Sequence, residues 1–366
     1  MGRIDHTQVV TPVRSCAEDS EESPGCPLPV NEYQAVLLAH GGGGRLTQQL
    51  VRHLFLSQFQ NEHLNRLHDG AVLPVSASRL AFTTDSYVVN PIVFAGGDIG
   101  KLAVNGTVND LAMCGARPCY LSAAFIIEEG LPMDELRRIA CSMQDAARHA
   151  GVHVVTGDTK VVDRGKGDKL FITTSGIGLI DSGVDIHPSR LRPGDKIILS
   201  GPIGQHGIAI LSAREGLEFE SQIESDTAPL GELVMRMLEA CKNVHVLRDP
   251  TRGGVATTLN EIAAQAKLGL VIDEERIPVP DEVRGACEIL GLDPLYVANE
   301  GKLLAGVPTA DCALVLDAMR AHPQGRDATV IGEVTADHPG MVLMKTRIGG
   351  MRVVDLLSGE QLPRIC

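Results

Sequence analysis

The sequence contains no tryptophan, and aromatic residues make up only 3% of its 366 residues. Glycine and the aliphatic residues supply most of the apolar content, which is 44% of the chain. Small and branched aliphatic side chains suit close packing of helices on a sheet, so the composition favours an α/β (α+β) fold over a β-sandwich. At this length we expect two domains of ordinary size.

The sequence also lacks a basic stripe, a secretory signal peptide and any apolar run of about 18 residues. Its formal net charge is −13. This balance disfavours a nucleic-acid-binding protein, and the lack of long apolar runs disfavours a membrane protein. We therefore expect a cytoplasmic protein whose nine cysteines stay reduced. Their spacing offers no paired zinc ligands.

Composition divides the chain into four segments. Residues 1–34 are rich in serine, glutamate, aspartate and proline, and we expect a disordered lead-in there. Residues 35–185 and 186–357 are predicted to form an N-terminal domain and a C-terminal α/β domain. Residues 358–366 show no helical or strand period, which predicts a flexible tail. Its last residue, Cys366, is either a tethered carrier thiol or part of a frayed terminus.

A glycine run, formed by Gly41, Gly42, Gly43 and Gly44, follows His40 and precedes an amphipathic helix predicted to end near Phe59. Bare backbone N–H groups at the positive end of a helix suit a phosphate group. A flexible hinge is an equally good interpretation. The spacing of the glycines does not match a dinucleotide-binding fingerprint.

The stretch Gly97–Lys101 is a near match to a P-loop, but it lacks the serine or threonine that would hold magnesium. The pattern instead predicts a helix with Asp98 as its N-cap. Lys101, Asn105 and Asn109 follow at four-residue spacing, so they line one face of that helix. A solvated face more often carries glutamate and lysine, so amides on this face indicate contacts with a nucleotide and a metal ion.

Two aspartates, Asp85 and Asp158, are predicted to lie where an apolar strand meets a turn. Asp249 precedes a predicted helix over residues 256–266. Carboxylates gathered at such positions form a good magnesium site, because magnesium prefers oxygen ligands. Each aspartate taken alone is more often a solvated turn residue.

Five motifs occur in the order found in the ATP-using superfamily of aminoimidazole ribotide synthetase, which this chain resembles. Within that superfamily, His40–Arg45 and the terminal Pro363–Cys366 resemble the hydrogenase maturation family of carbamoyl dehydratases. The resemblance covers residues from about 35 to 366. The five motifs are Thr84–Ser86, Asn105–Asp110, Gly157–Thr159, Asp249–Gly254 and Asn299–Gly301.

The resemblance implies a two-domain aminoimidazole-ribotide-synthetase-like fold. In that fold the N-terminal domains of a homodimer pair into a β-barrel, with ATP near the dimer interface. It also implies the reaction. The carbamoyltransferase HypF places a carbamoyl group on the thiol of Cys366, and ATP-dependent dehydration converts that group to a thiocyanate. The cyanide then passes to iron on a HypC–HypD scaffold for the nickel–iron hydrogenase centre.

The resemblance further implies roles for individual residues. Cys366 is the covalent carrier, and Lys160 and Glu300 transfer protons and stabilise charge. The expected cofactors are ATP and Mg²⁺. Magnesium is expected on Asp85, Asp110, Asp158 and Asp249, and ATP on His40, Gly41, Gly42, Gly43, Gly44, Lys101, Asn105, Asn109 and Thr159.

Two alternatives stay open on the sequence. One is another ATP-dependent enzyme of the superfamily, but a selenophosphate synthetase needs a reactive cysteine or selenocysteine where this chain has His40. A small-molecule kinase has no use for a terminal cysteine. The other is a non-enzymatic carrier that offers Cys366 to a partner and binds nucleotide only as a switch.

Overall fold

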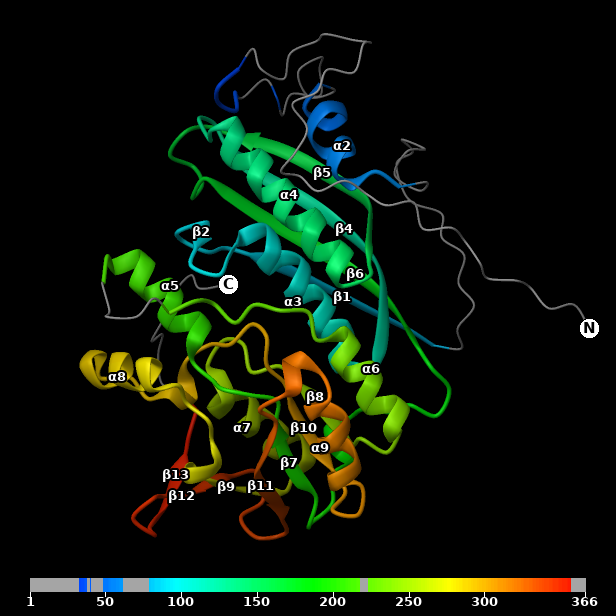
Figure 1. Cartoon of the computed structure of the whole chain (residues 1–366), viewed down its shortest axis with the longest axis vertical. Coiled ribbons are helices and arrows are strands. Elements are labelled where there is room, and N and C mark those ends of the chain that lie inside the picture. Colours follow the sequence, from blue (N-terminus) through cyan, green and yellow to red (C-terminus); the bar gives the residue numbers. More distant parts are fainter. Residues whose placement is uncertain (1–32, 38–39, 41–48, 62–78, 218–222, 357–366) are drawn as a thin grey trace, which may run out of the picture.

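The structure is a computed structural model that describes residues 33–37, 40, 49–61, 79–217 and 223–356. Two sheets organise the fold, one of four strands in the N-terminal half and one of seven strands in the C-terminal half (Figure 1). The glycine run, nearly all of the predicted lead-in and the predicted tail with Cys366 lie outside the described residues.

The N-terminal sheet has the strand order β1-β6-β4-β5, with β4 and β5 parallel and the other pairs antiparallel. Helices α3 and α4 pack against each other on one face of this sheet (Figure 1). A short π-helical turn, η3, leads into α2, and both contact α4. The bounds are η3 Val51–Phe55, α2 Leu56–Phe59, β1 Arg79–Tyr87, β2 Val93–Phe94, β3 Gly97–Asp98, α3 Ile99–Met113, β4 Ala116–Glu128, α4 Met133–His149, β5 His153–Val162 and β6 Leu170–Ile180.

The C-terminal sheet has the strand order β13-β12-β9-β11-β7-β10-β8, in which only the β12–β9 pair is parallel. The strands are β7 Lys196–Leu199, β8 Val246–Arg248, β9 Gly269–Asp273, β10 Leu304–Val307, β11 Thr329–Thr335, β12 Val342–Lys345 and β13 Met351–Val354. The α-helices are α5 Gln205–Glu215, α6 Gly231–Ala240, α7 Gly254–Ala266, α8 Asp281–Leu290 and α9 Cys312–Arg320. Single 3₁₀ turns are η5 Pro188–Arg190, η6 Glu274–Arg276, η7 Pro294–Tyr296 and η8 Pro323–Gly325.

Helix α3 is the central element, because it contacts the N-terminal sheet, α4 and helix α6 of the C-terminal half. Its N-cap is confirmed: the Asp98 carboxylate accepts hydrogen bonds from the backbone N–H groups of Gly100 at 2.8 Å and Lys101 at 2.9 Å. Gly100 allows α4 to approach closely, since a Cβ atom there would lie 2.6 Å from the carbonyl oxygen of Ile139. Little of α3 is left in contact with solvent.

The predicted position of Asp85 and Asp158 at strand ends is wrong, because both lie inside strands. The sequence around Asp158 looks like a turn because it contains Gly157. That glycine instead permits close approach to β4, since a Cβ atom there would collide with the carbonyl oxygen of Ala123. Asp158 is tolerated in β5 because its side chain is exposed to solvent. Asp85 is tolerated in β1 although it points toward α3, because hydroxyl groups of Tyr87 and Thr107 lie beside its carboxylate.

The face of the N-terminal sheet opposite α3 and α4 carries exposed apolar side chains. Leu80 is 46% exposed, Phe82 is 67% exposed and Ile126 is 42% exposed. Across the described strands this sheet is open, with β1 and β5 at its edges, and no closed barrel is found. The expected barrel between two subunits, like the domain boundary near residue 185, stays a prediction.

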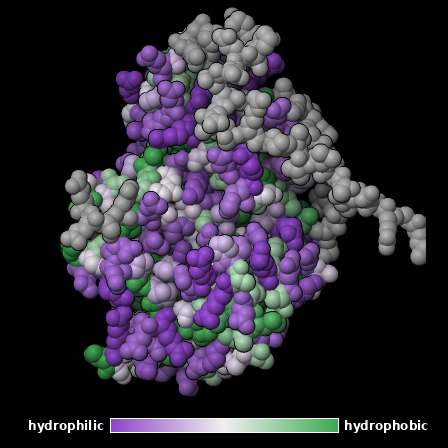
Figure 2. All heavy atoms as spheres, in the orientation of Figure 1, coloured by the Kyte–Doolittle hydropathy of each residue, from purple (hydrophilic) through white to green (hydrophobic). Residues whose placement is uncertain are grey.

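The molecular face in Figure 2 is mostly hydrophilic, with hydrophobic residues in smaller groups. One such group projects where the β12–β13 hairpin lies in Figure 1. None of the described helices is long and apolar enough to span a bilayer.

Candidate active site

A small cavity of about 90 Å³ lies where the two halves of the chain meet. Four carboxylates line it: Asp85 on β1, Asp110 on α3, Asp249 after β8 and Glu300 before β10. Three of the four predicted magnesium ligands are therefore brought together with one of the predicted catalytic residues. The remaining lining residues are Ser86, Tyr87, Gly106, Thr251 and Arg252.

Hydroxyl groups lie within hydrogen-bond distance of the carboxylates of Asp85 and Asp110, the two acids in the N-terminal half of the chain. The Thr107 hydroxyl and the Tyr87 hydroxyl each lie 3.3 Å from the Oδ2 atom of Asp85. The hydroxyl of Thr83 donates to the Oδ2 atom of Asp110 at 2.8 Å. Because Thr83, Asp85 and Tyr87 alternate along β1, their side chains share the face of the sheet that meets α3.

The loop that carries Asp249 depends on two glycines in the left-handed region, Gly253 with φ +75° and Gly254 with φ +61°. A Cβ atom at Gly254 would lie 2.7 Å from the carbonyl oxygen of Val297, so only glycine fits this close approach. The loop therefore lies directly against the backbone of the 295–297 segment. This contact keeps Asp249 close to the segment that carries Glu300.

Burial raises the pKa of Asp110 to about 7, with further contributions from the charges of Asp249 and Asp85. Burial likewise raises the pKa of Asp249 to about 6, partly opposed by a backbone hydrogen bond and the charge of Arg248. Carboxylates in a poorly solvated site raise one another's pKa unless a cation compensates them. The cavity therefore favours bound positive charge.

Glu300 is the most deeply placed of the four acids. Burial raises its pKa well above the ordinary value, and the charges of Asp249 and Asp226 add to the effect. Among the described residues its Oε1 atom has no hydrogen-bond partner. Its backbone is fixed at both ends: the N–H donates to Asp226 at 3.1 Å, and the carbonyl oxygen accepts from Asn109 at 3.3 Å. Glu300 thus lines the cavity from a fixed segment, and one of its carboxyl oxygens is buried without a hydrogen-bond partner among the described residues.

Within the described ranges, no three His, Cys, Asp or Glu side chains are close enough to form a ready-made metal site. The donor set still fits Mg²⁺, which is commonly bound by one or two carboxylates together with waters and substrate phosphates. In the absence of a cation, burial and the neighbouring carboxylate charges raise the pKa values of Asp110 and Asp249.

The amide face of α3 lies away from these carboxylates. Lys101 and Asn105 line a second, larger cavity, and Asn105 donates to the Thr227 hydroxyl at 3.2 Å. The buried Asn109 side chain joins the two halves: it donates to the carbonyl oxygens of Ala228 and Glu300 and accepts from the N–H of Leu230 at 2.7 Å. In this chain Asn109 therefore positions the Glu300 segment.

Asp158 and Lys160 lie on edge strand β5, three strands away from Asp85 in the order β1-β6-β4-β5. Three steps of about 4.8 Å separate them by roughly 14 Å. The two side chains form an ion pair at 3.3 Å, and each is 65% exposed. Within one chain, the structure therefore does not bring Asp158 or Lys160 to the carboxylate cavity.

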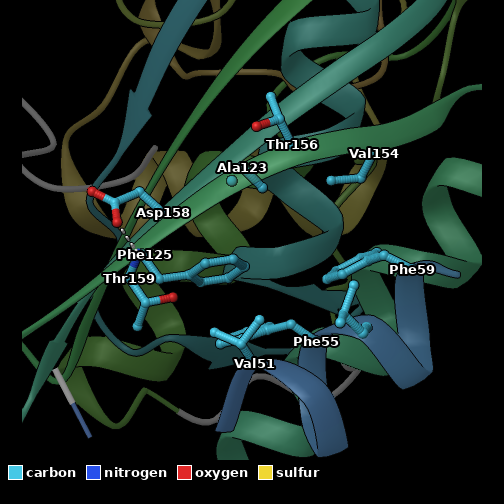
Figure 3. Close-up of a pocket in the computed structure, with 11 residues that line it drawn as sticks. Val51, Phe55, Phe59, Ala123, Phe125, Val154, Thr156, Asp158 and Thr159 are labelled. Atoms are coloured by element: carbon cyan, nitrogen blue, oxygen red, sulfur yellow. Dashed lines mark hydrogen bonds between the residues drawn. The ribbon is translucent and has the colours of Figure 1, made fainter. Parts of the chain in front are cut away.

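Asp158 and Thr159 instead border a third cavity, of about 170 Å³, between β5 and the η3–α2 segment (Figure 3). The rings of Phe55 and Phe125, which both line it, stack on each other with centroids 4.6 Å apart. Among the described residues, those that line this cavity include no lysine, arginine or histidine. Its other lining residues are Val51, Leu56, Phe59, Ala123, Val154, Thr156 and Gly157.

His40 is buried, and its Nδ1 atom accepts a hydrogen bond from the N–H of Leu37 at 2.9 Å. Burial lowers the pKa of His40. The adjacent residues Gly41–Gly44 and the carrier Cys366 lie outside the described residues, so their predicted roles stay predictions.

The residues that support the acids were not predicted from the sequence. Thr83 and Tyr87 were detectable, because they flank Asp85 with the two-residue period of a strand. Asp226 carries no motif and lies outside the described helices and strands. Its side chain is buried, and it pairs with Lys302 at 3.1 Å as well as accepting the N–H of Glu300.

Comparison with known proteins identifies the family. Residues 67–180 match the AIR synthase related protein, N-terminal domain, and residues 192–344 match the corresponding C-terminal domain. The chain is 57% identical over 330 residues to carbamoyl dehydratase HypE of Cupriavidus necator, which covers 90% of this chain and 94% of that protein. The chain belongs to the HypE family.

Solved HypE structures share the fold. A crystal structure of hydrogenase maturation protein HypE in complex with ATP is 51% identical, with a TM-score of 0.87 over 90% of this chain and 99% of that one. A HypE–HypF complex is 46% identical, with a TM-score of 0.75 over 84% of this chain and 99% of that one. This chain therefore has the mixed α/β, two-domain HypE architecture.

The raised pKa values predict a pH-dependent stability. Between about pH 4 and pH 7 the folded chain binds more protons at Asp110 and Asp249 than the unfolded chain does. The free energy of unfolding in EDTA should therefore fall as the pH rises from 5 to 7.5. Asp110→Asn should reduce this loss by about 1–3 kcal/mol, measured by urea denaturation. The exposed control Asp158→Asn should leave the loss unchanged, and an equal loss in Asp110→Asn would contradict the assignment.

Proposed function

We propose that the chain is an ATP-dependent carbamoyl dehydratase that acts on the S-carbamoyl group of its own Cys366. The product is a thiocyanate, which donates cyanide to the iron of nickel–iron hydrogenase. The observation that carries the proposal is the cavity that places Glu300 beside Asp85, Asp110 and Asp249. Relatives named carbamoyl dehydratase HypE and a HypE–ATP complex support it.

The carbamoyl oxygen is a poor leaving group, so the reaction must first convert it into a phosphate, which leaves readily. The carbamoyl oxygen attacks the γ-phosphorus of ATP, so that an O–P bond forms and ADP leaves. One N–H proton is lost, which gives a phosphorylated imidate. The C–O bond then breaks, phosphate leaves, and the second N–H proton is lost as the C≡N bond forms. The net change in the protein is the loss of one water.

Glu300 is the proposed proton acceptor. Its Oε1 atom has no partner among the described residues, and its segment is fixed by Asn109 and Asp226. A base works best when its pKa lies near the working pH, and burial raises the pKa of Glu300 in that direction. The absence of a competing hydrogen bond leaves this oxygen available for the carbamoyl N–H group.

The other three acids would hold magnesium. When bound there, Mg²⁺ neutralises triphosphate charge and helps to align the γ-phosphate with the carbamoyl oxygen. A cavity of about 90 Å³ is too small for a whole nucleotide, so it would take the phosphate end of ATP. Arg252 also lines the cavity and would add positive charge beside the phosphates. We propose that the backbone of Gly41–Gly44 contacts the nucleotide as well.

We assign Asp158, Thr159 and Lys160 to the active site of the partner subunit in a homodimer. They are too far from Asp85 within one chain, and they lie on a sheet that exposes Leu80, Phe82 and Ile126. Pairing of two such sheets would cover these apolar side chains and bring β5 of one subunit to the cavity of the other. A dimeric β-barrel is consistent with the open sheet.

HypF is the proposed donor of the carbamoyl group, supported by a solved HypE–HypF complex. A HypC–HypD scaffold is the proposed acceptor of the cyanide. We place the reaction in the cytoplasm, because Cys366 must remain a free thiol to accept the carbamoyl group. A carrier without enzymatic activity is the alternative. It gives no reason for a buried glutamate, one oxygen of which has no partner in the described part of the chain, beside three aspartates.

Intact mass spectrometry tests the reaction. With HypF and carbamoyl phosphate the chain should gain one carbamoyl group, and with ATP it should then lose the mass of one water. Cys366→Ala should show neither change. Glu300→Gln should accept the carbamoyl group but dehydrate it roughly 10²–10⁴-fold more slowly, because it removes a proton acceptor. Glu333→Gln, on the distant strand β11, is the matched control. Dehydration by Glu300→Gln at the control rate would refute its role.

Subunit complementation tests the shared active site. Asp85→Asn and Lys160→Ala should each be inactive as homodimers. A mixed dimer has one site that combines the intact Asp85 of one chain with the intact Lys160 of the other. After mixing and subunit exchange, activity should therefore return to roughly a quarter of the wild-type value. Failure of the mixture to recover, in samples where native mass spectrometry shows mixed dimers, would place Lys160 outside the partner's site.

A further inference from the structure

The second cavity has a volume of about 610 Å³ and lies between α3 and α4 on one side and the 227–229 segment on the other. Gln324 of the turn η8 closes its wall from the C-terminal half. The cavity therefore spans the junction of the two halves of the chain. A small molecule bound there would contact both.

The lining is electropositive. Lys101, Arg138 and His149 contribute basic groups, whereas Asp145 is the one acidic residue among the described lining residues. Asp145 pairs with Arg148 at 3.2 Å, so its charge is already offset. The Nζ atom of Lys101 donates one hydrogen bond, to the carbonyl oxygen of Gly96 at 2.9 Å, and an ammonium group has two further donors.

Arg138 also lies near a buried acid, Asp98, whose pKa is raised mainly by burial and lowered in part by the charge of Arg138. The Asp98 carboxylate accepts the N–H groups of Gly100 and Lys101 as the cap of α3. Because these donors already satisfy that carboxylate, the guanidinium of Arg138, on the exposed side of α4, remains able to bind a second anion.

An amide on the cavity wall provides an independent observation. Asn105 is fully buried, and among the described residues its Oδ1 atom has no hydrogen-bond partner. Its Nδ2 atom donates to the hydroxyl of Thr227, which also lines the cavity. A buried amide with an unsatisfied oxygen has an energetic cost that a donor on a bound ligand would remove.

This cavity is separate from the carboxylate cavity. No described residue lines both. On α3, Lys101 and Asn105 face one way, whereas Gly106 and Asp110 face about 140° around the helix axis from them. The carboxylate cavity needs a bound cation before it can accept a phosphate group. The basic groups of the second cavity attract an anion in the absence of any metal ion.

We propose that the second cavity is a binding site for a small molecule that carries a phosphate group, independent of magnesium. Arg138 and Lys101 bind the phosphate oxygens, and a hydroxyl or amino group of the ligand donates to Asn105. This site goes beyond the proposed dehydratase function and does not depend on it.

Isothermal titration of the full-length chain in EDTA tests the proposal, with inorganic phosphate and AMP as probes. At least one probe should bind saturably. Tighter binding of AMP would identify a nucleotide as the ligand, and equal binding would identify the phosphate group alone. Arg138→Gln and Gln324→Glu should each weaken binding about tenfold, through a lost charged contact and an added negative charge.

Two controls make the test specific. Arg137→Gln alters the neighbouring arginine on α4, which does not line the cavity, and should bind as the wild type does. Asp249→Asn alters only the carboxylate cavity and should also bind normally. The proposal is overturned if neither probe binds, if both cavity variants bind as tightly as the wild type, or if Asp249→Asn abolishes binding.

Discussion

Buried carboxylates at the junction of the two halves impose the main constraint on this structure. Asp85, Asp110, Asp249 and Glu300 line one cavity, and burial raises the pKa of the last three. Such an arrangement costs stability unless a cation or protons compensate it. The fold therefore maintains a site whose carboxylates must be compensated by protons or by a bound cation. A site for a metal ion and a triphosphate has this property.

The remaining structure holds this site in place. Helix α3 packs between the N-terminal sheet, α4 and α6, and it carries Asp110 on one side and Asn109 on another. Asn109 and Asp226 bind the backbone of Glu300 from the two halves of the chain. Asp226 is in turn paired with the buried Lys302. Because these polar groups are buried and mutually bonded, they fix the relative position of the acids.

Motif order and strand or helix period made much of this predictable from the sequence. The N-cap at Asp98 follows from a local helix-start pattern. The gathering of Asp85, Asp110 and Asp249 with Glu300 was expected from the order of the family motifs, not from strand or helix period. The separation of Asp158 and Lys160 was not predictable, because it depends on the strand order β1-β6-β4-β5. Gly157 misled the prediction, since it serves close strand packing rather than a turn. The role of Asp226 could not be predicted from a local pattern, because its partners Glu300 and Lys302 are distant in sequence.

Proton release on binding tests the central claim most directly, namely that the carboxylate cavity exists to bind magnesium and triphosphate. Calorimetry of magnesium–ATP binding near pH 6.5, in buffers of different ionisation enthalpy, counts the protons released. Because burial raises the pKa of Asp110 to about 7, a cation bound there should displace a proton. The wild type should release protons, and Asp110→Asn should release fewer. Equal proton release by the two, or none by the wild type, would contradict this account.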